Sequence, residues 1–303
     1  MIAVVYARKP CQWHPSAGLV SDVEIVGTSL VRDTLAWLAH WGVDRASVVS
    51  ASGKYAPSPS WDSPLELFAP EDLPPFSEPL VAVDCIALQR MRLDVALDVL
   101  ERSSAELLCP LSPTGNDARR PLALGRPDAM LQSIQEVDSG PRMTNLSLTG
   151  TAVASGSSAA LIASNPQAFD PSDPTALIDP AVVAVETVGG YFRCVDSPRS
   201  FLLCCHDVLS RKVVPWFGSP IPKEGTVVEE PATVLSPLQG HCWIGEGARI
   251  GTNCCIESCV VMSEAFVGEG CRLKHVLVLP GCRVKPRTIM EDKYLSVIGW
   301  DGE

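Results

Sequence analysis

The chain contains the stretch Ile244-Gly-Glu-Gly-Ala-Arg-Ile-Gly-Thr-Asn-Cys-Cys-Ile-Glu-Ser-Cys-Val-Val-Met262, in which a large apolar residue returns at every sixth position. A period of six belongs to neither an α-helix nor an ordinary β-strand, whose side chains repeat every 3.6 and 2 residues. It is typical of a parallel β-helix, in which each hexad forms one short side of a triangular coil and points its aliphatic residue inward. The stretch therefore predicts a coil of short stacked strands.

The six-residue period extends in both directions from this stretch. It begins upstream at Val228 and Val234 and continues downstream to Val284. The steps from 262 to 267 and from 279 to 284 are five residues long, so we expect loops or bulges there. The repeat spans about residues 226 to 290 and supplies fewer than four coils of 18 residues. Because so short a coil is not expected to stand alone, it predicts an appendage to another domain.

The composition describes a globular, acidic chain. Its 303 residues are 46% hydrophobic, which suits one large or two ordinary domains with a buried core. A net charge of -11 and a sequence pI of about 5.0 argue against nucleic-acid or anionic-membrane partners. No run of 18 apolar residues occurs, and the apolar run Ile2–Tyr6 is too short for a signal sequence. We therefore expect a soluble, cytoplasmic protein.

Twelve cysteines are spread along the chain without a Cys-x-x-Cys pair. This pattern favours reduced core residues over a disulfide framework. Five of them lie within the hexad region, where a small apolar side chain fits a tight coil. Their spacing favours this packing role over a metal site. These five are Cys254, Cys255, Cys259, Cys271 and Cys282.

The chain before the coil alternates between strand and helix patterns. An apolar run at 2–6, an amphipathic segment at 30–41 and an apolar run at 46–49 predict a parallel βαβ unit. Residues 51–79, rich in proline and serine, predict a loop. The further expected strands are 80–83, 106–110, 147–154 and 191–195, with a hairpin from 122–124 and 130–134 and helices at 93–100, 157–164 and 200–210. We therefore predict a three-layer α/β domain at 1–212, a linker at 213–230 and a β-helix domain at 231–303.

Three segments resemble motifs of one enzyme family. Gly27-Thr-Ser-Leu-Val31 opens a helical segment that ends at Gly42-Val43, and Val81-Ala-Val-Asp84 is a strand that ends in an aspartate. Gly190-Tyr-Phe-Arg-Cys-Val-Asp-Ser-Pro-Arg-Ser-Phe201 precedes a helix and then the coil. These segments resemble "G-x-P-L-(I/V)", "N-G-D" and "G-Y-W-x-D-I-G-T-P-x-x-Y" of the sugar-nucleotide pyrophosphorylases, which join a sugar 1-phosphate to a nucleoside triphosphate and release pyrophosphate. The resemblance implies a nucleotidyltransferase-like, Rossmann-like first domain and a left-handed coil.

The nucleotide loop departs from that family's pattern. Members carry a glycine-rich "G-G-x-G-(T/S)-R-L" loop, since backbone amides must approach the triphosphate closely. Here the equivalent segment, Tyr6–Gly18, has no glycine cluster, and Pro10 and Pro15 remove two amide donors. The family's "P-K" element is replaced by Val23–Gly27. We therefore expect reduced or lost catalysis.

The resemblance also implies site residues. The family's chemistry uses Mg²⁺ held by two carboxylates, of which Asp84 represents the first and is the catalytic candidate. The second falls on Cys194, a poor ligand for a hard cation, while Asp196 lies about 6.6 Å further along an extended strand and is the alternative metal ligand. Arg8 and Lys9 are candidates for phosphate contact. The competing interpretation of all four is structural: a strand-end aspartate, a displaced carboxylate and a solvated basic pair.

Three functional hypotheses follow. The first is a sugar-nucleotide nucleotidyltransferase-family protein that binds a nucleotide or sugar nucleotide, has reduced or lost catalysis, and acts in regulation or assembly as a homo- or hetero-oligomer. The second is a structural module that oligomerises through the coil. The third is a hexapeptide-repeat acyltransferase, which needs a catalytic histidine. Only His241 and His275 lie near the coil, and we expect both to be structural or solvent-facing.

Overall fold

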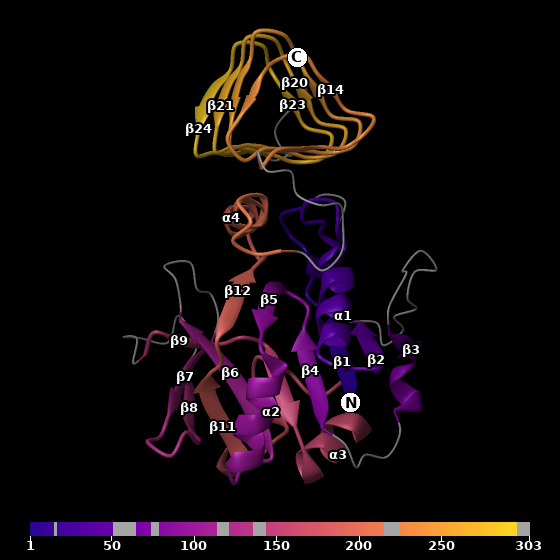
Figure 1. Ribbon diagram of the computed structural model, residues 1–303, viewed down its shortest axis with the longest axis vertical. Coiled ribbons are helices and arrows are strands. Elements are labelled where there is room, and N and C mark those ends of the chain that lie inside the picture. The colour runs from indigo at the N-terminus through magenta and orange to yellow at the C-terminus, as the bar shows by residue number, and fades with distance from the viewer. Residues whose placement is uncertain are drawn as a thin grey trace. The chain divides into compact units, whose positions relative to one another are not determined.

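The computed structural model describes residues 1–14, 17–50, 65–73, 79–113, 121–135, 144–214 and 225–295 (Figure 1). The chain divides into two compact units, each built from two separate parts of the sequence. The first unit comprises Met1–Lys9 and Thr34–Phe192, and the second comprises Pro10–Asp33 and Arg193–Glu303. The boundaries at 212 and 230 expected from the sequence stay predictions. None of the helices in the described residues has the length and apolar character that a membrane crossing requires.

The first unit is built on a large mixed sheet with the order β3-β2-β1-β4-β10-β6-β9-β7-β8, and β11 also pairs with β6. Strands β1, β2, β3 and β4 are mutually parallel, whereas β10 runs antiparallel to both β4 and β6. Every residue of β1 is buried, as expected for a strand covered on both faces. The strands are β1 (Ile2–Ala7), β2 (Arg45–Ser50), β3 (Glu66–Phe68), β4 (Leu80–Asp84), β6 (Leu107–Pro113), β7 (Leu122–Gly125), β8 (Leu131–Gln135), β9 (Leu146–Leu148), β10 (Thr151–Ala154) and β11 (Val183–Thr187).

Helices and a small second sheet accompany the large sheet, and those helical residues that fall within Pro10–Asp33 belong to the second unit. The α-helices are α1 (Leu30–His40), α2 (Leu93–Arg102) and α3 (Gly156–Ser164), and the 3-10 helices are η1 (Val20–Asp22), η2 (Pro70–Asp72), η3 (Pro174–Ala176) and η4 (Pro180–Val182). Strand β5 (Ala87–Met91) pairs with β12 (Gly190–Cys194). The indole of Trp37 on α1 is fully buried and donates a hydrogen bond to the Met91 carbonyl at 3.1 Å. This bond fastens α1 to β5 and pairs the buried indole N–H.

Several sequence predictions are confirmed and others need correction. The opening βαβ unit and the hairpin β7-β8 are present. Residues 66–68, expected to be loop, form β3, which pairs with β2. The single strand expected at 147–154 is two strands, because Gly150 adopts a positive φ of 71° between them. Residues 51–64 and 74–78 of the expected loop lie outside the described residues.

The C-terminal region consists of short parallel strands in three stacked sheets, an arrangement consistent with a β-helix (Figure 1). The first sheet contains β13 (Val227–Val228), β16 (Trp243–Ile244), β19 (Val260–Val261), β22 (Leu277–Val278) and β25 (Tyr294–Leu295). The second contains β14 (Thr233–Val234), β17 (Arg249–Ile250), β20 (Phe266–Val267) and β23 (Arg283–Val284). The third contains β15 (Leu238–Gln239), β18 (Cys255–Glu257), β21 (Arg272–Lys274) and β24 (Ile289–Glu291). The upstream start at Val228 and Val234 is therefore confirmed.

The positions of the five-residue steps differ from those expected. Val261 rather than Met262 pairs with Ile244, and Val278 rather than Leu279 pairs with Val261. The short steps therefore run from 256 to 261 and from 273 to 278. From residue 244 onward the coils advance by 17 residues, whereas the first coil advances by 16 residues in two sheets and by 18 in the third. Because residues 260–262 are all apolar and all buried, the hexad pattern alone cannot choose the stacked residue among them.

One outer face of the coil is also apolar, and helix α4 (Pro198–Leu209) of the same unit packs near this face. Trp243 and Val260 precede the inward residues of their strands, yet both are buried. The Phe201 ring on α4 lies 6.4 Å from the Trp243 ring, and Trp13 lies 5.1 Å from Phe201. A capping box between Ser197 and Ser200 begins α4. The second unit thus has a continuous aromatic core between helix and coil.

Candidate functional site

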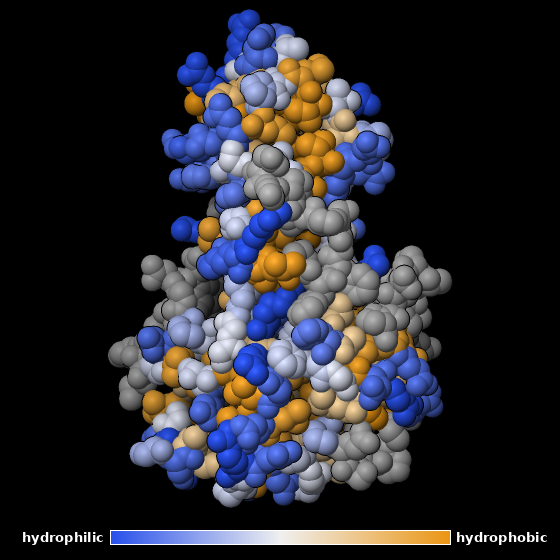
Figure 2. Space-filling model, in the orientation of Figure 1, coloured by the Kyte–Doolittle hydropathy of each residue, from blue (hydrophilic) through white to orange (hydrophobic). Residues whose placement is uncertain are grey.

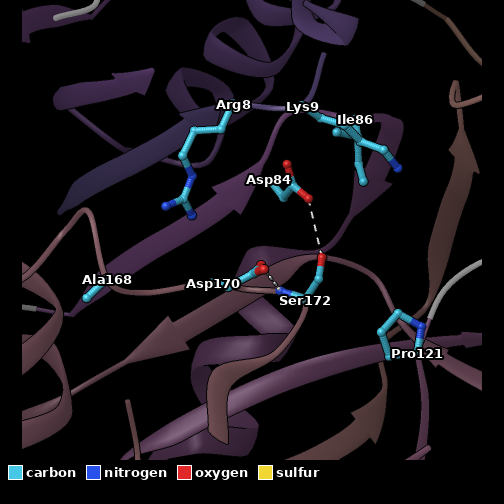
Figure 3. A pocket seen from close by; sticks show the side chains of 8 residues that line it. All are labelled: Arg8, Lys9, Asp84, Ile86, Pro121, Ala168, Asp170 and Ser172. Carbon is cyan, nitrogen blue, oxygen red and sulfur yellow. Dashed lines mark hydrogen bonds between the residues drawn. The ribbon is translucent and has the colours of Figure 1, made fainter. Parts of the chain in front are cut away.

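A pocket of the first unit lies where the order of the large sheet reverses. The chain passes from β1 to β2 on one side, while β4 pairs with the other side of β1. In open α/β sheets, ligands bind outside the carboxyl ends of the strands at such a switch point. Arg8 and Lys9 follow β1 directly, and Asp84 ends β4. These three residues line a pocket of about 520 Å³ together with Ile86, Pro121, Ala168, Asp170 and Ser172 (Figure 3).

Arg8 is engaged by the protein itself. Its Nη1 donates to the Gln167 carbonyl at 2.9 Å and its Nη2 to the Phe169 carbonyl at 2.6 Å. The guanidinium also lies over the Tyr6 ring, 4.3 Å from its centre. Burial raises the pKa of Tyr6 far above its usual value, so the ring stays neutral beneath the cation. Arg8 therefore holds the 167–169 loop against the end of β1, a structural role that the sequence did not reveal.

Two carboxylates meet around Ser172 in the pocket (Figure 3). The Ser172 hydroxyl donates to Asp84 Oδ2 at 3.3 Å, and the Ser172 amide donates to Asp170 Oδ1 at 2.8 Å. The Asp84 amide donates to the Gly150 carbonyl at 2.6 Å, which fixes the strand end that carries this carboxylate. With exposed Lys9 nearby, the pocket offers acceptors for hydroxyl groups or a cation and an ammonium group for an anion.

Asp170 and Ser172 were missed by sequence reasoning. They belong to the segment Asp170-Pro-Ser-Asp173, whose proline and short polar residues signal a turn. That signal indicates local conformation and not proximity to Asp84, which lies 88 residues from Ser172 in the sequence. The order of the strands brings the two segments together.

The predicted second metal ligand lies in the other unit. Asp196 lies just before α4, and Ser200 lies in the first turn of that helix. The Asp196 carboxylate accepts a hydrogen bond from the Ser200 hydroxyl at 3.2 Å. No group of three or more histidine, cysteine, aspartate or glutamate residues is placed to hold a metal ion in the described parts of the chain. Magnesium is commonly bound by one or two carboxylates, with water and substrate phosphates completing its shell. Asp84 and Asp170 supply such a donor set.

The loop after β1 uses some of its amides internally. Pro10 has no amide donor, the Cys11 amide donates to the Gly18 carbonyl at 3.1 Å, and the Ala17 amide donates to His14 Nδ1 at 3.1 Å. Pro15 and Ser16 lie outside the described residues. Because those two amides are already paired, they do not form the open amide cradle that a triphosphate requires.

The cysteines are free thiols, and most are buried. Burial raises the pKa of Cys109 and of Cys259 to about 12, so both thiols stay protonated at neutral pH. The core role predicted for the coil cysteines is confirmed for Cys254, Cys259, Cys271 and Cys282. It is wrong for Cys255, which is exposed because it faces outward from β18.

Comparison with known proteins gives no match: no protein-family model matches this chain, and no curated protein does. The pocket combines a switch point in the sheet, two carboxylates around one serine, and a lysine at the end of the neighbouring strand.

Proposed function

We propose that this chain is a sugar-nucleotide nucleotidyltransferase-family protein that binds a nucleotide or sugar nucleotide in the switch-point pocket. The observation that carries the proposal is the placement of Lys9 and Asp84 at the carboxyl ends of adjacent parallel strands, in one pocket. Phosphate groups bind at this place in open α/β sheets. In the same proposal the first unit contains the nucleotidyltransferase-like three-layer domain, and the coil is left-handed.

Within this proposal the pocket residues have distinct roles. Lys9 binds a phosphate as a point charge, whereas Arg8 positions the loop that carries Asp170. Asp84 and Asp170 hold Mg²⁺, which when bound neutralises charge on the phosphates. Asp170 replaces Asp196 as the second carboxylate, because it shares the pocket with Asp84.

The same observations support reduced or lost catalysis. In an active enzyme, an oxygen of the sugar 1-phosphate attacks the α-phosphate in line and pyrophosphate leaves. Stabilising the triphosphate in that reaction takes several convergent amide donors. Here Pro10 lacks an amide, and the amides of Cys11 and Ala17 are paired within the loop. Binding without efficient turnover fits a regulatory or assembly role.

Thermal unfolding with each nucleoside triphosphate and Mg²⁺ tests the binding step. We expect at least one nucleotide to raise Tm, since ligand at 100 times its Kd stabilises a protein by about 2.7 kcal/mol. Asp84→Asn and Lys9→Met should abolish most of the increase, while Asp196→Asn should keep it. If no nucleotide or sugar nucleotide changes Tm, the binding proposal fails.

A turnover assay tests the catalytic part separately. Protein, Mg²⁺, each nucleoside triphosphate and a panel of sugar 1-phosphates are mixed, and pyrophosphate release is measured. We expect release at background level. Robust release that Asp84→Asn removes would overturn the loss of catalysis while supporting the family assignment.

The coil supports the assembly part of the proposal. Phe266 on β20 and Ile289 on β24 face outward, with exposed fractions of 38% and 74%. Figure 2 shows apolar residues at the surface of the coil. Aromatic side chains and arginine are enriched at protein interfaces, and Arg283 lies over the Phe266 ring at 5.8 Å. We infer that the coil contributes the contact through which copies or partner chains assemble.

A further inference from the structure

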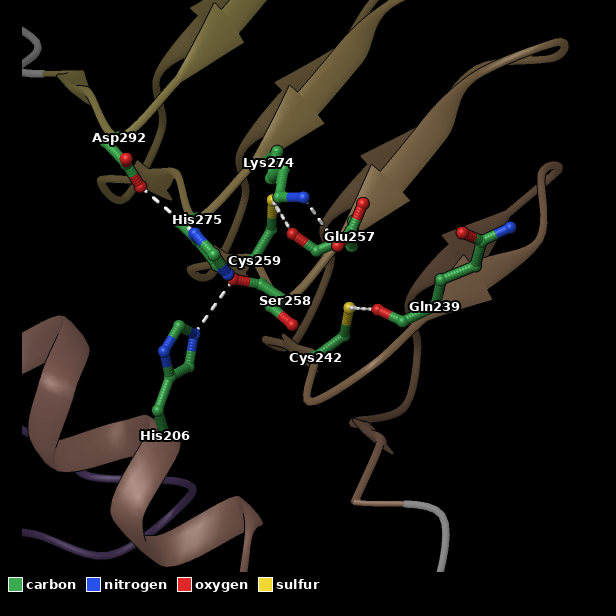
Figure 4. A network of polar contacts seen from close by, with 9 residues as sticks. All are labelled: His206, Gln239, Cys242, Glu257, Ser258, Cys259, Lys274, His275 and Asp292. Carbon is green, nitrogen blue, oxygen red and sulfur yellow. Dashed lines mark hydrogen bonds and ion pairs between the residues drawn. The ribbon is translucent and has the colours of Figure 1, made fainter.

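A column of residues forms the corner of the coil that faces α4 (Figure 4). Ser258, His275 and Asp292 each follow the last residue of a strand of the third sheet, and all three adopt positive φ values of 48°, 49° and 51°. Their amides donate to the carbonyls of Gln239, Glu257 and Lys274 in the coil before, which holds the corner rigidly. The corner is therefore a fixed platform for whatever packs on it.

His206 of α4 docks on this platform. Its Nε2 lies 2.8 Å from the Ser258 carbonyl, so this nitrogen carries a proton and donates it. Its ring lies 5.9 Å from the His275 ring at an interplanar angle of 63°. His275 Nδ1 in turn lies 3.1 Å from Asp292 Oδ1.

A third imidazole belongs to the same group. His241 Nδ1 is buried and has no hydrogen-bond partner among the described residues. Gly225 packs closely against this ring, because a Cβ added to Gly225 would lie 2.1 Å from His241 Nδ1. Both His241 and His275 interact unfavourably with a charge on His206. We call His206, His241 and His275 the histidine cluster.

The charged groups around the histidine cluster are already paired. Asp207, next to His206 on α4, binds Arg193 at 2.8 Å and Lys212 at 3.3 Å. Glu257 binds Lys274 at 3.0 Å, and Asp292 binds His275. Asp207 favours a charge on His206 only in part, because its carboxylate is shared with Arg193 and Lys212.

We propose that the histidine cluster is an acid-sensitive latch that holds α4 against the coil when neutral and releases it when protonated. At neutral pH, His206 donates to Ser258 without adding charge. In mild acid, a charge on His206 is partly desolvated and lies beside the His275 ring. Release uncovers the apolar face that includes Trp243 and Val260, which becomes available to another apolar surface.

The direction of the pH effect follows from the environment of His206. Burial, opposed in part by the hydrogen bond to Ser258, lowers the pKa of His206 below its usual value. An opened or unfolded chain then takes up more protons than the closed form as the pH falls below about 6.5. The latch therefore contributes its full stability above that pH and loses it as the pH falls toward the pKa of His206 in the closed form.

Amide hydrogen exchange at pH 7.5 and 5.5, corrected for intrinsic rates, tests the latch in the full-length protein. We expect α4 and β19 to exchange several-fold faster at pH 5.5 in the wild type. His206→Gln keeps an amide donor for the Ser258 carbonyl but cannot take up a proton, so its exchange should change little between the two values. His40→Gln, which removes an exposed histidine of α1, should behave as the wild type.

Equal acceleration in His206→Gln, or unchanged protection of α4 in the wild type, would overturn the proposal. An NMR titration of the wild type gives an independent readout that does not depend on the variant folding. The ring signals of His206 and the backbone signals of α4 should shift with one common midpoint below pH 6.5. Separate midpoints would show that protonation of His206 does not move the helix.

Discussion

At the scale of single residues, Gly190 is the described glycine of the first unit at which an added Cβ would come closest to another atom. This residue begins β12 with a φ of 142°, and a Cβ there would lie 2.2 Å from the Arg90 carbonyl oxygen of β5. Two non-bonded atoms cannot approach so closely, so any side chain at this position must push β5 and β12 apart. Gly189, its neighbour, has nothing within 4 Å of the same added atom.

Gly190→Ala is therefore expected to destabilise the protein by at least about 1–3 kcal/mol, the usual cost of a strained backbone conformation. Gly189→Ala provides the matched control and should change stability by no more than about 0.5 kcal/mol. Urea unfolding followed by circular dichroism measures both variants. Equal stability of the two would show that β5 and β12 do not pack as described.

At the scale of elements, the coil depends on its inward residues. Ile256 on β18 is fully buried and stacks between Leu238 and Leu273 of the adjacent coils. Ile289 on β24 has the same residue type but faces solvent. Substitutions at these two isoleucines therefore separate the contribution of packing to stability from that of residue type.

We expect Ile256→Ala to lower the free energy of unfolding by about 2–5 kcal/mol, because it removes buried methyl groups and leaves a cavity. Ile256→Val should cost only about 0.5–1.5 kcal/mol. Ile289→Ala, as the surface control, should stay within about 0.5 kcal/mol of the wild type. A larger loss for Ile289→Ala than for Ile256→Ala would reverse the assigned faces of the coil.

How well elements could be predicted depended on how strongly their side chains repeat. The strands around Ile244, Ile250 and Ile256 were predictable because inward residues recur with one period. The register failed at residues 260–262 and again at 276–279, where apolar residues are consecutive and the five-residue step is hidden. Strand β3 was missed because its three residues lie in a proline-rich segment and owe their pairing to β2.

At the scale of the whole molecule, the arrangement of segments decides what the sequence can reveal. Lys9 and Asp84 were candidates because their segments resemble family motifs, and each lies at the end of an apolar strand. Asp170 and Ser172 were not, since only the strand order of the sheet brings their loop to the same pocket. His206 was likewise not predicted near the coil, because the contact depends on how α4 packs within the second unit.

Assembly through the coil predicts concentration-dependent association in sedimentation velocity. Phe266→Ser and Ile289→Ser, tested one at a time, should leave the fold intact, and at least one should raise the dissociation constant tenfold or more, about 1.4 kcal/mol. Val214→Ser changes an exposed apolar residue outside the coil and should leave association unchanged. A chain that stays monomeric at every concentration, alone and with candidate partners, would contradict the proposed assembly.

The 17-residue advance of the coil from residue 244 onward has a consequence for how such a region changes in evolution. Residues 17 apart, such as Ile244 and Val261 or Ile250 and Val267, occupy equivalent places on neighbouring coils. Deleting or duplicating one complete coil therefore joins residues that already share a position, and each remaining inward side chain keeps its direction. An insertion or deletion of six residues instead moves every later side of the triangle to a different sheet. We therefore expect length in this part of the coil to change by whole coils.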